Sequence, residues 1–300
     1  MNQIKNFYKK NYQVLSSDSI FRATVIKMGS PFIYKQSSET AEIFYRIFSH
    51  YLEEAELTLS LLNDLAPAKI MKLLEVGSGL GLVYGYLKKN GYDIYGLEPS
   101  AGGGHSEYFQ TAQRLMQLLD VDSSHMYPLA SDDLRELQQS FDIIFSNNVI
   151  EHVSDIKKFI QDLSHVLKPN GLMVHNAPNY LVPFEPHFGI PLVPWRPHLT
   201  RFFLPKIKKT SLWKSINFIT VSQLQKICRS LDLLITFKAG VMIGAFSRLE
   251  QESEFANKHK NLKVLHGILK KTGLLIFLNK LPPCLTTPII FTIRKKPQRS

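Results

Sequence analysis

A glycine-rich turn is the first feature of the sequence that could bind a ligand. Gly77, Gly79 and Gly81 follow an apolar run that begins near Met71, in the segment LLEVGSGLG. Glycine there permits a tight turn with positive φ and a close approach of the backbone to a ligand, with the amino end of the next helix behind it. Glu98 ends the next predicted strand about twenty residues later, where a carboxylate can accept hydrogen bonds from both ribose hydroxyls. The turn and the acid predict a site for a nucleoside-containing ligand.

The charge beside the turn discriminates between two kinds of nucleoside ligand. Dinucleotide-binding turns space their glycines GxGxxG, whereas this chain has GxGxG with Leu82 after it. Glu75 precedes the turn, and a carboxylate there can hold an ammonium group but repels a pyrophosphate. The electrostatics therefore favours a cationic cofactor that carries an amino acid.

Two other segments have side chains that could act on an acceptor. Glu151 and His152 follow the apolar run FDIIFSN, at the carboxyl edge where open α/β sheets bind ligands, and His152 could act as a general base. The proline-rich segment 180–215 has a second candidate base, His187, together with further polar groups in an aromatic frame: Glu185, Trp195, Arg196 and His198. We expect this segment to lie over the acceptor side of the pocket. The alternative is that Glu151 and His152 only order their loop and that the histidines of the segment only make hydrogen bonds.

The elements that must position these residues alternate between strands and helices. Residues 1–66 have apolar side chains at helical spacing. Short apolar runs typical of buried parallel strands then follow, separated by helical segments: KIMKLLEV, YDIYGLEP, FDIIFSN, GLMVHNAPN, LDLLITF and PIIFTIRKK. This order predicts an α/β fold, a doubly wound, mostly parallel Rossmann-like sheet. We divide the chain into an N-terminal helical arm or lid (1–66) and one domain (67–300), which contains an acceptor-side insertion after the fifth strand (180–215) and a basic amphipathic segment (253–280).

Composition and cysteine usage narrow the class of protein. A chain of 300 residues with 44% hydrophobic and 20% charged side chains can bury a sizeable core. The two cysteines, Cys228 and Cys284, form neither a disulfide framework nor a zinc-binding spacing, which favours the cytoplasm. The sequence contains no stretch of the roughly 18 apolar residues that a membrane span needs. We therefore expect a soluble protein that at most lies on a membrane.

The net charge of +11 is unevenly distributed along the chain. Residues 1–185 have 16 Lys and Arg against 21 Asp and Glu, whereas residues 186–300 have 20 against 4. The second part is therefore expected to face an anionic partner. The segment 253–280 has the composition of an interfacial helix that contacts an anionic membrane, and the alternative is a helix that covers the sheet with a solvated basic face. Nucleic acid is not favoured as a partner, because we find no RNA-binding motif and no basic run interleaved with stacking aromatics.

About residues 70–180 resemble the class I S-adenosylmethionine-dependent methyltransferases in four segments, which occur in the family's order. LLEVGSGLG resembles the first motif, Glu98 the ribose-binding acid, FDIIFSNNVIEHV the fourth-strand motif, and LKPNGLMVHNAPN the helix, turn and fifth strand. The resemblance implies a seven-stranded sheet and S-adenosyl-L-methionine as cofactor. The cofactor contacts that it implies are Glu75, Gly77, Ser78, Gly79 and Gly81 at the methionine moiety, Glu98 at the ribose, Ser131, Asp132 or Asp133 at the adenine, and Asn147.

Residues 142–153 resemble the ubiquinone-pathway O-methyltransferases. Their Glu-x-x-Glu-His pattern can hold a divalent metal, but Asn148 replaces its first Glu here, so we predict no metal site. The resemblance implies methyl transfer to an oxygen, or secondarily a carbon or nitrogen, of a small or lipid-linked acceptor, with His152, His187 and Glu151 as the candidate catalytic residues. Two alternatives are a methyltransferase-like, non-catalytic module that binds membranes or partners and an RNA methyltransferase.

Overall fold

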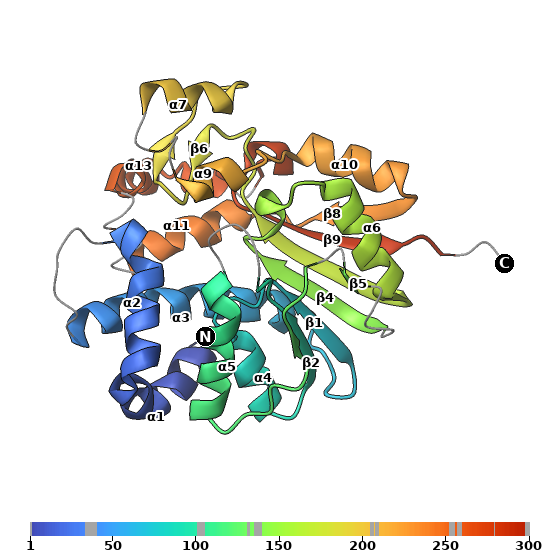
Figure 1. Ribbon diagram of the computed structural model, residues 1–300. Helices are drawn as coiled ribbons and strands as arrows, with labels where there is room; N and C mark the ends of the chain where they lie inside the picture. Colours follow the sequence, from blue (N-terminus) through green and yellow to red (C-terminus); the bar gives the residue numbers. More distant parts are fainter. Residues whose placement is uncertain are drawn as a thin grey trace. The chain divides into compact units, whose positions relative to one another are not determined.

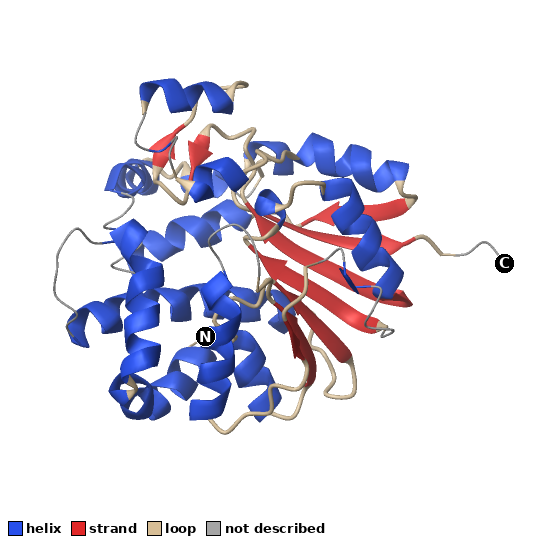
Figure 2. Cartoon of the chain, viewed as in Figure 1, coloured by secondary structure: helices blue, strands red, loops and turns tan. Residues whose placement is uncertain are grey.

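A seven-stranded sheet runs through the computed structural model, which describes residues 2–33, 41–100, 106–130, 133–134, 140–204, 207, 210–251, 256, 260–278 and 280–297. The strand order is β3-β2-β1-β4-β5-β9-β8. The strands are β1 (Lys72–Val76), β2 (Asp93–Leu97), β3 (Met126–Tyr127), β4 (Phe141–Asn147), β5 (Leu167–Ala177), β8 (Leu233–Phe237) and β9 (Ile289–Lys295). β1 is parallel to β2 and β4, β2 is parallel to β3, and β8 is antiparallel to β9. The predicted mostly parallel, doubly wound sheet is confirmed (Figure 2).

Each of the six predicted strands occurs in the structure. The structure differs from the prediction in one additional short strand and in the point where β5 begins. The two-residue strand β3 was not predicted, because two residues show no periodicity. β5 begins at Leu167, directly after α6 (Ile156–Val166), so that Pro169, Asn170 and Gly171 belong to the strand and not to a separate turn. β1 is flanked by β2 on one side and β4 on the other. The strand order therefore reverses at β1, which is where open α/β sheets bind ligands, outside the carboxyl ends of the strands.

The chain divides into two compact units, the first formed by residues 1–147 and 158–174 and the second by residues 148–157 and 175–300. In the first unit, α1 (Gln3–Ser17), α2 (Ser19–Ile33) and α3 (Ala41–Asn63) pack together and form the predicted helical arm (Figure 1). Phe44 and Phe48 stack at 5.3 Å within its core. The hydroxyl of the buried Tyr8 donates to the carbonyl of Leu82 at 2.9 Å, so α1 is tied to the start of α4 (Leu82–Lys89), the helix after the glycine turn. The predicted division at residue 66 itself stays a prediction.

The second unit contains the insertion and the C-terminal helices. The insertion forms a hairpin of β6 (Phe184–Glu185) and β7 (Ile190–Pro191), then the 3-10 helix η3 (Pro197–Leu199) and the helices α7 (Thr200–Phe203) and α9 (Ser211–Ser215). α10 (Val221–Ser230) begins with a capping box between Thr220 and Gln223, as the hydroxyl of Thr220 predicts. The helices α11 (Val241–Gln251), α13 (Lys260–Lys271) and α14 (Leu275–Leu278) follow.

The segment 253–280 was predicted to form one helical segment, and its described part is instead interrupted by a turn. Gly273 adopts a φ of 73°, and α13 ends just before it, so the described part forms two helices instead of one. α11 was not predicted. None of the helices in the described ranges is long and apolar enough to cross a membrane.

Candidate functional site

The glycine turn has the backbone geometry that the sequence predicts. Gly77, Gly79 and Gly81 have φ values of 72°, 53° and 71°, in the left-handed region that favours glycine. The N–H groups of Gly77 and Ser78 donate to the carbonyl of Leu97 at 2.8 and 2.9 Å, which ties the turn to the end of β2. A Cβ added at Gly79 would meet nothing within 4 Å. The turn is therefore fixed by hydrogen bonds to the end of β2, while a side chain added at Gly79 would face open space.

Two buried glutamates lie beside the turn in the first unit. Burial raises the pKa of Glu98 to about 7, although the N–H of Gly79 donates to its Oε2 at 2.7 Å. The pKa of Glu75 is raised well above its ordinary value, mainly by burial and to a lesser extent by the negative charge of Glu98. Oε2 of Glu75 is buried and accepts no hydrogen bond from the described residues. Two neighbouring carboxylates that are costly to ionise would be stabilised by a cation or by hydroxyl donors.

A pair of tyrosines near these carboxylates was not predicted. The hydroxyls of Tyr51 on α3 and Tyr108 on α5 (Ser106–Leu118) lie 3.1 Å apart. Burial raises the pKa of both, and the charge of Glu98 contributes to the rise at Tyr108. Tyr108 therefore lies within electrostatic reach of the predicted ribose acid. The only sequence signal is an aromatic residue in the first turn of the helix that follows this acid.

The remaining predicted cofactor contacts stay predictions. Ser131 and Asp132 lie outside the described residues. Asp133 is exposed, and its N–H donates to the carbonyl of Ala130 at 3.2 Å. Asn147 ends β4, and its Nδ2 lies 3.5 Å from both the carbonyl oxygen and Oε2 of Glu54 on α3.

The three predicted catalytic residues lie together in the second unit. Glu151, His152 and His187 each place one potential ligand atom within 4.8 Å of those of the other two. Nε2 of His187 is 4.0 Å from Oε1 of the buried Glu151, and the two imidazole rings are 5.2 Å apart. Glu151 and His152 belong to the 3-10 helix η2 (Ile150–His152), whereas His187 follows β6 in the insertion. The sequence predicts each residue but not their proximity.

The buried Glu185 determines which nitrogen of His187 is basic. Oε1 of Glu185 is 2.6 Å from Nδ1 of His187, and the N–H of Phe188 donates to Oε2 at 2.7 Å. Burial alone raises the pKa of Glu185, but the hydrogen bond and the charge of His187, together with the backbone donors, outweigh it and lower the pKa below its ordinary value. An ionised carboxylate only accepts hydrogen bonds, so Nδ1 of His187 carries a proton and Nε2 is the basic nitrogen.

Ser215 orients the ring of His152. Its hydroxyl lies 2.8 Å from the carbonyl of Leu212 and 2.9 Å from Nδ1 of His152. When the hydroxyl donates to this carbonyl it accepts from Nδ1–H, and Nε2 is then the basic nitrogen of His152 as well. In both histidines Nδ1 has an orienting partner, and Nε2 is the basic nitrogen of the neutral ring.

Asn217 holds η2 in place and was not predicted. Its side-chain amide donates to the carbonyls of Ile150 and Val153 at 2.7 and 2.9 Å, and its backbone N–H donates to the carbonyl of Glu151 at 2.8 Å. Asn148 has a φ of 54°, a left-handed conformation that asparagine tolerates better than glutamate. Asparagine at position 148 is therefore explained by the backbone turn that leads into η2.

The three clustered residues offer two nitrogens and a carboxylate, a donor set that can also hold a divalent ion. Two ligands at about 2.1 Å from one ion lie at most about 4.2 Å apart, and adjacent ligands lie roughly 3 Å apart. The 4.0 Å between Nε2 of His187 and Oε1 of Glu151 is close to that upper limit. The cluster would have to contract around an ion, and the expectation of no metal stays a prediction.

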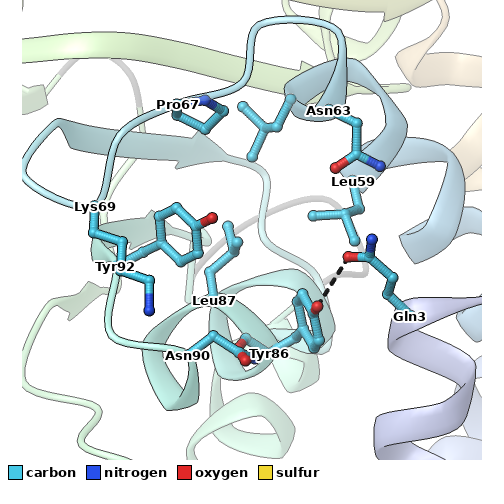
Figure 3. A pocket seen from close by; sticks show the side chains of 10 residues that line it. Gln3, Leu59, Asn63, Pro67, Lys69, Tyr86, Leu87, Asn90 and Tyr92 are labelled. Carbon is cyan, nitrogen blue, oxygen red and sulfur yellow. Dashed lines mark hydrogen bonds between the residues drawn. The ribbon is translucent and has the colours of Figure 1, made fainter.

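Figure 3 shows a cavity of ≈ 140 Å³ in the first unit, whose lining residues do not belong to the glycine turn. Its wall includes a hydrogen bond from the hydroxyl of Tyr86 to Oε1 of Gln3, 2.9 Å long. The lining residues are Gln3, Leu59, Leu62, Asn63, Pro67, Lys69, Tyr86, Leu87, Asn90 and Tyr92. Tyr92 directly precedes β2, and Pro67 and Lys69 belong to the connection that leads into β1, so the cavity lies at the amino ends of these strands. Ligands in such sheets bind at the carboxyl ends, which excludes this cavity as the cofactor site.

The fold is that of an α/β protein with a glycine turn and two buried carboxylates at the carboxyl ends of β1 and β2. The family model of the methyltransferase domain matches residues 48–233, and the chain belongs to this methyltransferase family. Membership confirms the predicted class I fold and S-adenosyl-L-methionine as the cofactor. The residues beside the turn fit this cofactor, because Oε2 of Glu75 can accept from its ammonium group and Glu98 from its ribose.

Several proteins are similar to this chain. An uncharacterized protein of Mycobacterium tuberculosis is 30% identical over 62% of this chain and 65% of its own length, so the chain spans just under two thirds of that relative. The ubiquinone biosynthesis O-methyltransferase of Pelagibacter ubique is 31% identical over 36% of this chain and 42% of its own. Among solved structures, the plantazolicin methyltransferase BpumL in complex with SAH is 13% identical, covers 98% of both chains and has a TM-score of 0.47.

Proposed function

We propose that the protein transfers a methyl group from S-adenosyl-L-methionine to a hydroxyl oxygen of a small or lipid-linked acceptor. The observation that carries this proposal is the pair of Glu185 and His187, in which a buried, ionised carboxylate leaves Nε2 of the imidazole as the basic atom. A hydroxyl must lose its proton when it is methylated, so it needs such a base. The similarity to ubiquinone biosynthesis O-methyltransferases supports an oxygen acceptor.

Each residue has a distinct role in this proposal. The bound cofactor supplies a methyl group activated on a sulfonium. Glu75 holds its ammonium and Glu98 its ribose hydroxyls, so that alignment of the reacting atoms supplies most of the acceleration. His187 takes the hydroxyl proton at Nε2, and Glu185 stabilises the imidazolium that forms.

Along the chain, the glycine turn and η2 both follow the carboxyl ends of neighbouring strands. β1 and β4 are parallel neighbours, with Glu75 in register with Phe145, so their carboxyl ends lie at the same edge of the sheet. The glycine turn directly follows β1, and η2 begins only three residues after β4 ends at Asn147.

The proposal is tested with methyl-labelled cofactor and an organic extract of host cells as the source of acceptors. We expect a labelled product whose methyl group resists mild alkali, as an ether does. The variant His187→Ala should lose at least a hundredfold in turnover, the order of magnitude that a general base contributes, while keeping its affinity for S-adenosylhomocysteine. The matched control is His198→Ala, because this exposed histidine of the same insertion packs edge-on against Phe218.

Three results would contradict parts of the proposal. Unchanged turnover in His187→Ala would leave His152 as the candidate base. A label found on nitrogen or carbon, or in an alkali-labile ester, would exclude a hydroxyl acceptor. A protein that binds no S-adenosylhomocysteine would favour the alternative of a non-catalytic module.

A further inference from the structure

The C-terminal helices expose an unusual amount of apolar surface. α13 and α14 contact each other, and both pack on α11. The packed side of α13 is marked by the buried His266, which stacks on Phe246 of α11 with ring centroids 5.6 Å apart. Lys270 is bound to Glu250 of α11 at 2.7 Å. These contacts settle which side of α13 faces the protein.

Large exposed apolar side chains lie on these two helices and on the turn between them. Six of them are between 44% and 68% exposed: Val264, Leu265, Ile268, Leu274, Ile276 and Phe277. Val264 and Ile268 are four residues apart and therefore share one side of α13. The turn at Gly273 then leads into α14, where Ile276 and Phe277 are the most exposed of the α14 side chains. We call these six residues the apolar face. Exposed apolar patches of this kind mark sites of interaction with a partner or a membrane.

The chain segment that contains the apolar face has charged side chains of one sign only. Residues 255–300 contain ten Lys and Arg and no Asp or Glu. Lys263, Lys271 and Lys280 are exposed, and within the described ranges no carboxylate lies within 4.0 Å of their ammonium groups. Lysines beside apolar side chains can keep their charge at an interface while their methylenes cover apolar surface.

We propose that the apolar face and its lysines dock the protein onto an anionic phospholipid surface. Phe277 and Ile276 insert among the acyl chains, and Lys263, Lys271 and Lys280 contact the headgroups. Five of the six apolar residues are aliphatic, which suits hydrocarbon, whereas nucleic acids are bound by stacking aromatics. A second copy of the chain would bring the same lysines against each other, and like charges repel. This inference does not depend on the acceptor or on the catalytic residues.

The test is co-sedimentation of the full chain with vesicles of phosphatidylcholine alone or mixed with phosphatidylglycerol. We expect binding to the mixed vesicles at about 0.1 M salt and a large loss at about 0.5 M, because the headgroup attraction is screened. The double variant Ile276→Ser/Phe277→Ser should weaken binding at least tenfold. The double variant Lys263→Gln/Lys271→Gln should weaken it by roughly ten- to thirtyfold and reduce its salt dependence.

The controls are exposed residues of the first unit. Ile20→Ser/Ile70→Ser removes two side chains that are 67% and 90% exposed, and Lys9→Gln/Lys10→Gln removes two positive charges from α1. Both should bind like the parent, and unchanged circular dichroism and S-adenosylhomocysteine affinity verify the fold of every variant. Equal binding to both kinds of vesicle, parental binding by the apolar-face variants, or no vesicle binding at all would overturn the proposal. Two further results would also overturn it, if the same variants abolish them. One is dimerisation without vesicles, and the other is binding of a single-stranded oligonucleotide in place of vesicles.

Discussion

The buried carboxyl of Glu98 should destabilise the ligand-free protein as the pH rises. Its pKa is raised by burial to about 7 from an ordinary value of 4.5. Between these values the folded protein keeps a proton that the unfolded chain has released, so the free energy of unfolding falls with pH and levels off above about 7. This difference in pKa corresponds to about 3 kcal/mol at high pH.

The variant Glu98→Gln removes the ionisation and keeps an oxygen for the N–H of Gly79. We expect it to be more stable than the parent by about 3 kcal/mol at pH 8 and to gain almost nothing at pH 4, where the carboxyl is mostly protonated in both states. Urea unfolding at about pH 4, 6 and 8 measures this difference. The control is Glu107→Gln, which removes a partly exposed carboxylate of α5 that pairs with Lys27. A variant less stable than the parent at pH 8, or a gain independent of pH, would refute the reasoning.

Binding of S-adenosylhomocysteine should respond to the same carboxyl in the opposite sense. The ionised form is the one expected to accept hydrogen bonds from both ribose hydroxyls, and its population rises from about one tenth at pH 6 to about nine tenths at pH 8. The affinity of the parent should therefore rise about tenfold over this range. Calorimetric titration of Glu98→Gln should show weaker binding and a smaller rise. An unchanged rise in the variant would assign the pH dependence to another group, with Glu75 the first candidate.

Three further predictions test the two groups of site residues. Gly79→Ala adds a methyl group in open space at a φ of 53°. It should lower the free energy of unfolding by about 1 kcal/mol and the affinity for S-adenosylhomocysteine at least tenfold. The control Gly244→Ala, in α11, should leave this affinity unchanged. Removal of divalent ions by a chelator should not change turnover, and activity restored by added Mg²⁺ or Zn²⁺ would show that Glu151, His152 and His187 bind a metal. Asn217→Ala should lower turnover more than cofactor affinity, since it releases η2, and equal losses in both would indicate general unfolding.

The sequence predicts the features that depend on local residue types. The glycine turn requires positive φ at three positions, and the six long strands are apolar runs bounded by turn residues, so both follow from neighbouring residues. The turn into η2 shows the limit of motif comparison. The loss of the first Glu at position 148 predicts that no metal binds, whereas the structure adds that asparagine there suits a left-handed backbone.

Features that depend on contacts between distant segments could not be predicted. His152 and His187 come from separate segments, and their rings lie 5.2 Å apart only because the insertion returns to η2. Asn217 and the pair of Tyr51 and Tyr108 act through partners far away in the sequence, so no spacing rule marks them. The exposure of Phe277 depends on which side of α14 packs on α11 and α13, which composition alone leaves open.

The opposite pKa shifts of two buried glutamates separate two kinds of functional side chain. Glu185 accepts from the imidazole of His187 and from backbone donors, so its charge is stabilised within the chain and its pKa is lowered. Glu98 accepts from the N–H of Gly79, which is too little to offset burial, and its pKa is raised. A carboxylate whose charge is already stabilised can orient another residue, whereas one that lacks sufficient donors gains them when a ligand binds. On this physical ground we assign Glu185 to positioning the base and Glu98 to binding the cofactor.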